Sequence, residues 1–352
     1  MAHLIQFLQR AYRHMRLVAH HKNKTRTFNG NDMYPQAFKP RFPWIGSDLQ
    51  TLRNILSPPR PELARWPEQT LWFRASNGVD WLSGRLQSPA GTSRPLVAIA
   101  HGLTGSCEGA TLVASAAVLL AAGYPVLRLN LRGAGETAPR CASFYHTGLT
   151  ADIAALIPQL PDPAANGVIL MGYSLGGNTV LKYLTEGMVA DAVLGGAAVS
   201  APIMPAHAVA AIERPRNTLY ARYLLKWMKE GAAASQFPAP LKQAAAAARS
   251  IRHYDETVTA PMHGFQGAED FYSQAASAPH LRQLARPALV ITAQDDSWIP
   301  VADYRKVDWA AIPHATCRIS DGGGHCGFHA ADASVPWHDR ALLAWLADML
   351  GV

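Results

Sequence analysis

The chain has 352 residues, of which 49% are hydrophobic and 16% are charged, a balance typical of a globular protein with one large domain or two small ones. Its net charge of +7 comes mostly from six Arg and Lys side chains before the first acid, Asp32, so the remaining chain carries +1. We therefore expect no nucleic-acid-binding surface. Cys107, Cys141, Cys317 and Cys326 form no CxxC pair, and no His, Cys, Asp or Glu cluster has metal-ligand spacing. We expect neither a disulfide framework nor a metal or other cofactor.

The first 29 residues form a basic segment of amphipathic character. Residues 1–21 repeat apolar side chains at three- and four-residue spacing, with Arg10 and Arg13 on the other face. No apolar run reaches the roughly 18 residues that a membrane-spanning helix needs. Three interpretations stay open: an interfacial helix in which residues 1–26 contact anionic lipid, a helix packed on its own domain or on a partner, and an Arg-rich mitochondrial presequence. We expect a cytoplasmic protein, either free or peripheral at a membrane.

Beyond a stretch rich in proline and aromatic residues, the chain predicts alternating strands and helices. Segments 69–75 and 78–88 flank a Ser-Asn-Gly turn signal and predict an antiparallel hairpin. Short apolar runs typical of buried strands then alternate with helical patterns. The expected strands are 95–100, 125–130, 167–171 and 191–199, and the expected helices are 109–122 and 148–160. This rhythm predicts an α/β fold with a mostly parallel sheet flanked by helices.

The alternation of strand and helix patterns stops between residues 203 and 283, where only helical patterns occur. We interpret this stretch as a helical cap inserted over the carboxyl edge of the sheet. Strand patterns resume at 287–292 and 316–320, and a helix is expected at 336–349. The predicted organisation is a basic segment at 1–29, a first part of the core at 30–202, the cap at 203–283 and a second part of the core at 284–352.

The sequence Gly172-Tyr-Ser-Leu-Gly176 joins an expected strand to an expected helix. A strand that enters a helix through G-x-S-x-G is a nucleophile elbow, a tight turn that lifts the serine hydroxyl above the sheet. Glycines flank the serine because a side chain at either position would collide with the neighbouring strand or helix. This context makes Ser174 the candidate nucleophile.

An elbow serine needs an acid and a histidine, which follow it in that order along the chain. Asp296 lies at the end of an expected strand, four residues before Pro300, and we prefer it as the acid, with Asp295 as the reserve candidate. His325 follows the last expected strand in a glycine-rich loop that can bring it over the serine. Of the 14 histidines, it alone occupies the position that the order demands.

The same chemistry needs two backbone N–H groups that bind the negative oxygen of the reacting carbonyl. One is expected from the residue after the nucleophile, Leu175. The other is expected from the loop after the strand at 95–100, where we favour Leu103. Leu103 and Leu175 are thus the candidate oxyanion hole.

As a set, these motifs resemble the YheT-like group of α/β-hydrolases, AB hydrolase family 4, over about residues 40–350. The resemblance rests on Asp48-Leu-Gln-Thr51 (the family usually has His in place of Asp48), His101-Gly-Leu-Thr-Gly-Ser106, Asn130-Leu-Arg-Gly133, Tyr145-His-Thr-Gly148, the elbow with Gly177, Arg249-Ser-Ile-Arg252, Thr259-Ala-Pro-Met-His-Gly-Phe265, Asp295-Asp296 and Gly323-Gly-His-Cys-Gly-Phe328. It implies an α/β-hydrolase fold and hydrolysis of carboxylic esters, either short acyl esters or acylglycerols, through Ser174, Asp296 and His325. Membrane-anchored relatives carry an N-terminal transmembrane helix, whereas this chain has only its basic segment.

These observations predict a cofactor-free serine carboxylesterase that acts on a small-molecule ester through an acyl-enzyme. Two alternatives stay open. An acyltransferase would use the same triad with an alcohol in place of water, and a non-catalytic protein would bind at a membrane surface through its basic segment. Epoxide hydrolases and dehalogenases of this fold normally have Asp at the elbow, so Ser174 argues against both.

Overall fold

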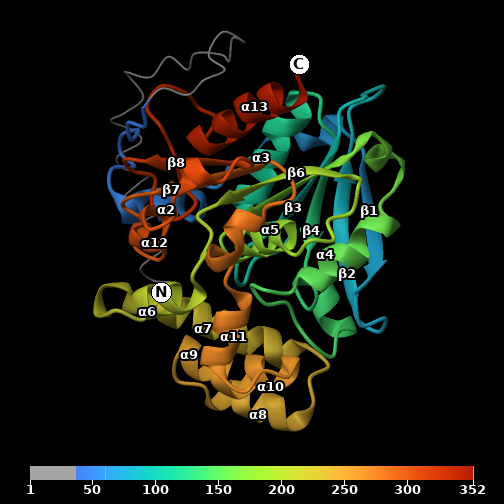
Figure 1. Ribbon diagram of the computed structural model, residues 1–352. Helices are drawn as coiled ribbons and strands as arrows, with labels where there is room; N and C mark the ends of the chain where they lie inside the picture. The colour runs from blue at the N-terminus through green and yellow to red at the C-terminus, as the bar shows by residue number, and fades with distance from the viewer. Residues whose placement is uncertain (1–36, 60, 352) are drawn as a thin grey trace.

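The computed structural model describes residues 37–59 and 61–351. The helix expected at 1–21, and with it the lipid contact expected through residues 1–26, falls outside the described residues. The centre of the molecule is an eight-stranded sheet of order β1-β2-β4-β3-β5-β6-β7-β8 (Figure 1). Its strands are β1 (Glu68–Arg74), β2 (Trp81–Gln87), β3 (Leu96–Ala100), β4 (Val126–Asn130), β5 (Val168–Tyr173), β6 (Val193–Val199), β7 (Ala288–Ala293) and β8 (Ala315–Ser320).

The sheet is mostly parallel, as the sequence predicts. β1 pairs with β2, and β2 with β4, in antiparallel register. Every other neighbouring pair of strands is parallel. The central parallel strands β3, β5 and β7 are almost continuous apolar runs, because helices cover both faces of the sheet there and leave neither face in water.

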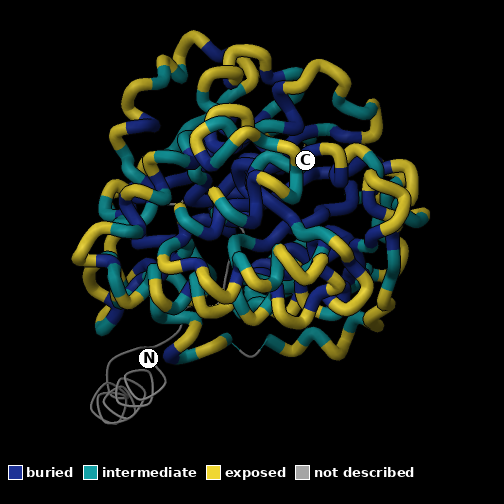
Figure 2. Tube along the Cα trace, turned by 90° about the horizontal axis from the view of Figure 1, so that it is seen from below, coloured by how far each residue is buried: buried dark blue, intermediate teal, exposed yellow. Residues whose placement is uncertain are grey.

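The flanking helices divide the core into two layers. They are α3 (Ala110–Ala121), α4 (Thr150–Leu156), α5 (Leu175–Thr185), α12 (Val301–Arg305) and α13 (Trp337–Leu350), with α2 (Ser47–Leu56) at the edge. In β3, alternate residues Leu96, Ala98 and Ala100 join the apolar cluster that contains α4 and α5. Val97 and Ile99 join the cluster that contains α3 and α13. Figure 2 shows this buried centre within an exposed shell.

One helix differs from its expected range. The pattern at 148–160 gives an α-helix only from Thr150 to Leu156, followed by a 3₁₀ turn at Ile157–Gln159. Pro158 explains the change, because proline lacks the N–H that would donate the next α-helical hydrogen bond.

Between β6 and β7 the chain forms only helices in its described residues. These are α6 (Pro205–Ile212), α7 (Thr218–Ala234), α8 (Ala239–Ala247), α9 (Ile251–Tyr254), α10 (Ala260–His263) and α11 (Ala268–Ala275), with short 3₁₀ and π segments between them. In Figure 1, α7 to α11 gather below the sheet. They have an apolar cluster of their own, which includes Leu224, Met228 and Ile251.

The carboxyl ends of neighbouring strands meet at one edge of the sheet. β3 ends before His101, β5 before Ser174, β7 shortly before Asp296 and β8 shortly before His325. Ligand sites of open α/β sheets form at this edge. Within the described part of the chain, no helix is long and apolar enough to cross a membrane, and no group of three His, Cys, Asp or Glu residues could hold a metal ion.

Candidate active site

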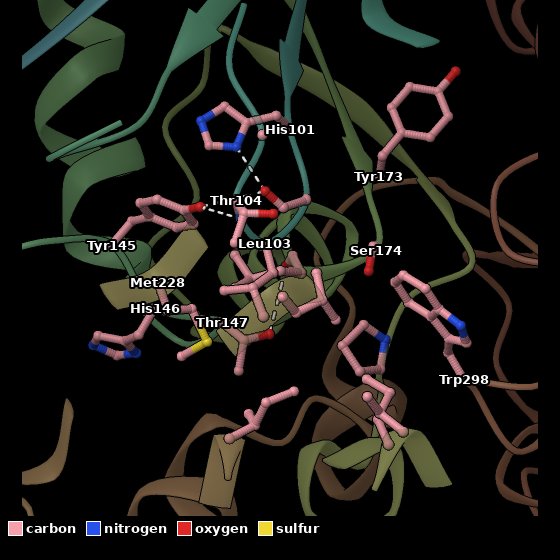
Figure 3. Close-up of a pocket in the computed structure, with 18 of the residues that line it drawn as sticks. His101, Leu103, Thr104, Tyr145, His146, Thr147, Tyr173, Ser174, Met228 and Trp298 are labelled. Atoms are coloured by element: carbon pink, nitrogen blue, oxygen red, sulfur yellow. Dashed lines mark hydrogen bonds between the residues drawn. The ribbon is translucent and has the colours of Figure 1, made fainter. Parts of the chain in front are cut away.

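Ser174 occupies the turn between β5 and α5. Its backbone has φ 51° and ψ −120°, a conformation that a non-glycine residue keeps only when its surroundings enforce it. A Cβ at position 172 would lie 2.2 Å from the Gly176 oxygen, and a Cβ at position 176 would lie 2.5 Å from the His101 oxygen. Only glycine fits at these two positions. The motif therefore sets the geometry that places the Ser174 hydroxyl at the cavity (Figure 3).

His325 lies between the serine and a carboxylate. Its Nε2 is 3.0 Å from Ser174 Oγ, and its Nδ1 is 2.9 Å from Asp296 Oδ2. The other carboxylate oxygen, Oδ1, accepts the N–H groups of Trp298 and Ile299. The Asp296 side chain is fully buried. The structure thus brings together the three residues that the sequence places in this role.

The reserve candidate, Asp295, has a different position. Its Oδ1 accepts the N–H of Gly324 at 2.9 Å, so it binds the backbone of the loop that carries His325. Burial raises the pKa of the Asp295 carboxyl. Asp295 therefore holds the histidine loop, while Asp296 contacts the imidazole.

Helix α2 also holds the histidine loop. Thr51 Oγ1 accepts the backbone N–H of His325 at 2.9 Å. The buried Gln50 side chain accepts the N–H of His329 at 2.7 Å and donates to the carbonyl oxygens of His329 and Trp44. Asp48–Thr51 is one of the motifs that carry the family resemblance, and its sequence alone indicates no role. The structure shows that the motif anchors the loop of His325.

Leu103 and Leu175, the two candidate residues of the oxyanion hole, both lie at the cavity beside the serine. Gly102 packs so closely on the elbow that a Cβ there would lie 3.1 Å from Ser174 Cβ. The next residue, Leu103, lines the cavity together with Leu175. Neither the Leu103 N–H nor the Leu175 N–H meets an acceptor among the described residues. Both donors are therefore available to an oxygen in the cavity.

His101 and Tyr145 fix the loop that carries Leu103. His101 Nε2 accepts the N–H of Leu131 at 3.2 Å, so its Nδ1 carries the proton and donates to the Gly102 oxygen at 2.7 Å. Burial lowers the pKa of His101 to about 4, which keeps this ring neutral. The Tyr145 hydroxyl accepts the N–H of Thr104 at 2.7 Å (Figure 3). His101 is therefore a positioning residue of the loop.

The surroundings of His325 favour its protonated form. Burial alone would lower its pKa, but the neighbouring Cys326 sulfur and the Asp296 carboxylate outweigh burial and raise the pKa of His325 above its ordinary value. The Trp298 ring stacks on the imidazole with ring centroids 4.4 Å apart and planes at 23°. An aromatic face attracts a cation. The surroundings of His325 thus stabilise an imidazolium at this position.

A cavity of about 300 Å³ opens beside Ser174. One side is made by the loops at the carboxyl ends of the strands, and the other by helices between β6 and β7. The apolar side chains of the second wall include Val209, Ile212, Leu224, Met228, Ile251 and Phe271. The sequence did not indicate that these side chains line the cavity. It also did not indicate the contact of Trp298 with His325, for which the only signal was the position of Trp298 two residues after Asp296.

The chain matches the family model described as "alpha/beta hydrolase fold" over residues 95–332. The Escherichia coli K12 protein named "Putative esterase YheT" is 28% identical over 267 residues, which cover 73% of this chain and 78% of that protein. Human phospholipase ABHD3 is 25% identical over 265 residues, covering 73% and 62%. Among solved structures, the Pyrococcus furiosus esterase Pf2001 has the same fold, with a TM-score of 0.56, 15% identity and coverage of 90% and 98%. Fold, sequence match and relatives agree that this chain belongs to the α/β-hydrolase fold family and resembles its YheT-like members.

Proposed function

We propose that the protein is a serine carboxylester hydrolase with Ser174 as nucleophile, His325 as general base and Asp296 as the orienting acid. One observation carries the proposal: a single buried imidazole joins a hydroxyl at 3.0 Å to a buried carboxylate at 2.9 Å. A serine hydroxyl is a weak nucleophile until an adjacent base takes its proton. His325 has that position, and Asp296 fixes the tautomer that leaves Nε2 free to accept.

In the proposed reaction, Ser174 Oγ attacks the ester carbonyl carbon as its proton passes to His325 Nε2. The carbonyl oxygen becomes negative and is bound by the N–H groups of Leu103 and Leu175. His325 then protonates the leaving alcohol, which leaves an acyl-enzyme. Water, activated by the same imidazole, attacks the acyl carbon and releases the acid and free Ser174.

The proposed substrates are short-chain or acylglycerol-type carboxylic esters. A largely apolar cavity of about 300 Å³ beside Ser174 suits an acyl chain, and the relatives named as esterase and phospholipase act on esters by name. We further propose that residues 203–283 act as a cap on a core made of residues 30–202 and 284–352. Helices α6, α7, α9 and α11 support this division because they supply one wall of the cavity.

Hydrolysis of p-nitrophenyl esters from short to long acyl chains tests the proposal. We expect Ser174→Ala to lower turnover by at least about 1,000-fold, because the enzyme loses its nucleophile, while circular dichroism shows an unchanged fold. Ser106→Ala is the matched control: Ser106 also lines the cavity, but its hydroxyl accepts only the N–H of Glu108. Equal turnover by wild type and Ser174→Ala would refute the proposed nucleophile.

Product analysis with an added alcohol separates hydrolysis from acyl transfer. A hydrolase releases mainly the free acid, whereas a transferase releases mainly the new ester. The lipid contact proposed for residues 1–26 has its own test, co-sedimentation of the full chain and of a chain lacking these residues with anionic vesicles. Equal binding of both chains would exclude a lipid-binding role for that segment.

A further inference from the structure

The cavity beside Ser174 contains one acidic side chain, Asp255, which comes from the helical insertion. Asp255 is 7% exposed. No Lys or Arg lines the cavity with it in the described part of the chain. The other side chains of that wall are mostly apolar. A buried acid in such surroundings is unfavourable unless something compensates its charge.

Two neutral hydroxyl groups hold the Asp255 carboxylate. Thr259 Oγ1 donates to Oδ1 at 2.8 Å, and the Tyr272 hydroxyl donates to Oδ2 at 2.7 Å. Each carboxylate oxygen can accept one further hydrogen bond. Among the described residues Asp255 takes part in no ion pair, and the charged group that acts on it is Glu213, which is also negative. The site therefore has unused acceptor capacity and uncompensated charge.

Burial raises the pKa of Asp255 to about 6, so the carboxyl is mostly ionised at neutral pH. The hydroxyls of Thr259 and Tyr272 oppose this rise, because they donate to the charged form. A hydrogen-bond donor that enters the cavity would add to their effect.

The backbone at this acid is also unusual. Asp255–Thr259 is a π-helical segment between α9 and α10. Such segments are rare and occur frequently at functional sites. Its two ends, Asp255 and Thr259, are joined by their side chains. The distortion and the buried acid therefore coincide at the cavity wall.

We propose that Asp255, held by Thr259 and Tyr272, is a specificity subsite that accepts a hydrogen bond from a hydroxyl or ammonium group of the substrate. The inference rests on the proposed function, because it assumes that the cavity receives the ester. It narrows the substrate class to esters that carry such a donor on an otherwise apolar chain. Plain alkyl esters would leave the carboxylate without a partner.

Calorimetric binding of three six-carbon probes tests the subsite without turnover. The probes are 1-methoxypentane, which has no hydrogen-bond donor, hexan-1-ol and hexan-1-amine. We expect the alcohol, the amine or both to bind wild type at least about tenfold more tightly than the ether, because hydrogen bonds to charged groups are strong. The probe that gains affinity identifies the donor as hydroxyl or ammonium.

Asp255→Asn should remove most of this preference, because the substitution keeps the shape and deletes the charge. Asp270→Asn is the matched control, since Asp270 lies on α11 of the same insertion but outside the cavity lining, and its carboxylate accepts only exposed groups of Gln266 and Gln274. Equal affinity of wild type for all three probes would overturn the subsite, even if Asp255→Asn does not fold. Because the probes are not esters, their binding tests the subsite even if the protein hydrolyses none of the esters assayed.

Discussion

The two walls of the cavity are held by different forces. On the core side, hydrogen bonds fix the groups of the proposed triad: Ser174 and Asp296 bond to His325, and Thr51 bonds to the His325 backbone. On the insertion side, apolar side chains such as Leu224 and Met228 pack in a cluster of their own. Hydrogen bonds fix direction and distance, whereas apolar packing tolerates exchanges of similar volume. The core wall therefore suits chemistry, and the insertion wall suits selection among substrates.

Trp298 joins the two walls. Its ring stacks on His325 on the core side and makes an edge contact with Tyr220 of α7, with centroids 5.1 Å apart. Asp255 is the exception on the insertion side, because it is a polar group in an apolar wall. We therefore expect substitutions on the core side to cause large losses of stability or turnover, and substitutions at the contact between the walls to cause smaller losses of turnover. Substitutions on the insertion side should change the preference among substrates.

The largest expected effect comes from crowding the elbow. In Gly172→Ala the new Cβ would lie 2.2 Å from the Gly176 oxygen, in backbone that cannot move aside. We expect the free energy of unfolding to fall by more than about 4 kcal/mol. In Gly231→Ala, in α7 of the insertion, the new Cβ meets no atom within 4 Å. This variant should raise the free energy of unfolding by about 0.5–1 kcal/mol, because alanine favours a helix over glycine. Urea unfolding measures both, and equal stability of the two variants would contradict the contrast between the tightly packed elbow and the insertion.

The next effect separates the two neighbouring acids. Asp296→Asn should lower kcat by about 10³–10⁴-fold, because the imidazole loses the carboxylate that orients it. Asp295→Asn should lower kcat by less than about tenfold, because an amide oxygen can still accept the Gly324 N–H. Steady-state kinetics on one ester distinguishes them, and a larger loss in Asp295→Asn would reverse their roles.

The pH profile of the Asp296→Asn variant adds a second readout. The Asp296 carboxylate helps to raise the pKa of His325, so its removal lowers that pKa. Activity requires neutral His325 and rises as pH passes through the pKa. The onset of kcat/KM in Asp296→Asn should therefore move to lower pH than in wild type. A shift to higher pH would contradict the proposed contact.

An intermediate effect is expected at the contact between the walls. Trp298→Leu removes the ring that stacks on His325 and should lower kcat/KM by about 10–100-fold, in keeping with the combined strength of cation–π and aromatic contacts. Trp227→Leu is the matched control, because Trp227 is exposed on α7. If both variants keep full activity, the stack has no part in catalysis.

The smallest expected effect is a change of preference. Val209 lines the cavity from α6, so Val209→Phe should shorten the space for an acyl chain. We expect the ratio of kcat/KM for long and short p-nitrophenyl esters to fall by about tenfold, as a few missing contacts would give, with little change for the acetate. Val79→Phe, on an exposed turn, should leave the ratio unchanged. An equal loss of kcat/KM on all esters would instead indicate that Val209 affects the reaction step and not the preference for acyl chain length.

The residues of the proposed triad could be predicted from sequence because each is tied to a local requirement. The elbow needs glycine at 172 and 176, and the strand ends place Asp296 and His325 at the same edge. The contacts that support them could not be predicted in this way. Thr51 and His325 are 274 positions apart, and no spacing in either segment indicates that they meet.

For the insertion, the sequence predicted a helical cap over the carboxyl edge of the sheet, but not which of its side chains line the cavity. Its apolar faces indicate burial, but the same pattern suits packing against a neighbouring helix and lining a cavity. Asp255 illustrates the difficulty, since within Tyr254-Asp-Glu256 it looks like an ordinary polar helix position. Only the π-helical turn and the contact with Tyr272 reveal that it is buried in the cavity wall.

The central claim is that the core wall activates Ser174 as a nucleophile. Intact-protein mass spectrometry after treatment with a fluorophosphonate tests it directly, because the reagent forms a stable adduct with an activated serine whatever the natural substrate is. We predict one adduct per wild-type chain, mapped to Ser174 by peptide sequencing, and no adduct on folded Ser174→Ala. An unlabelled wild type, or an adduct that persists in Ser174→Ala, would contradict the account.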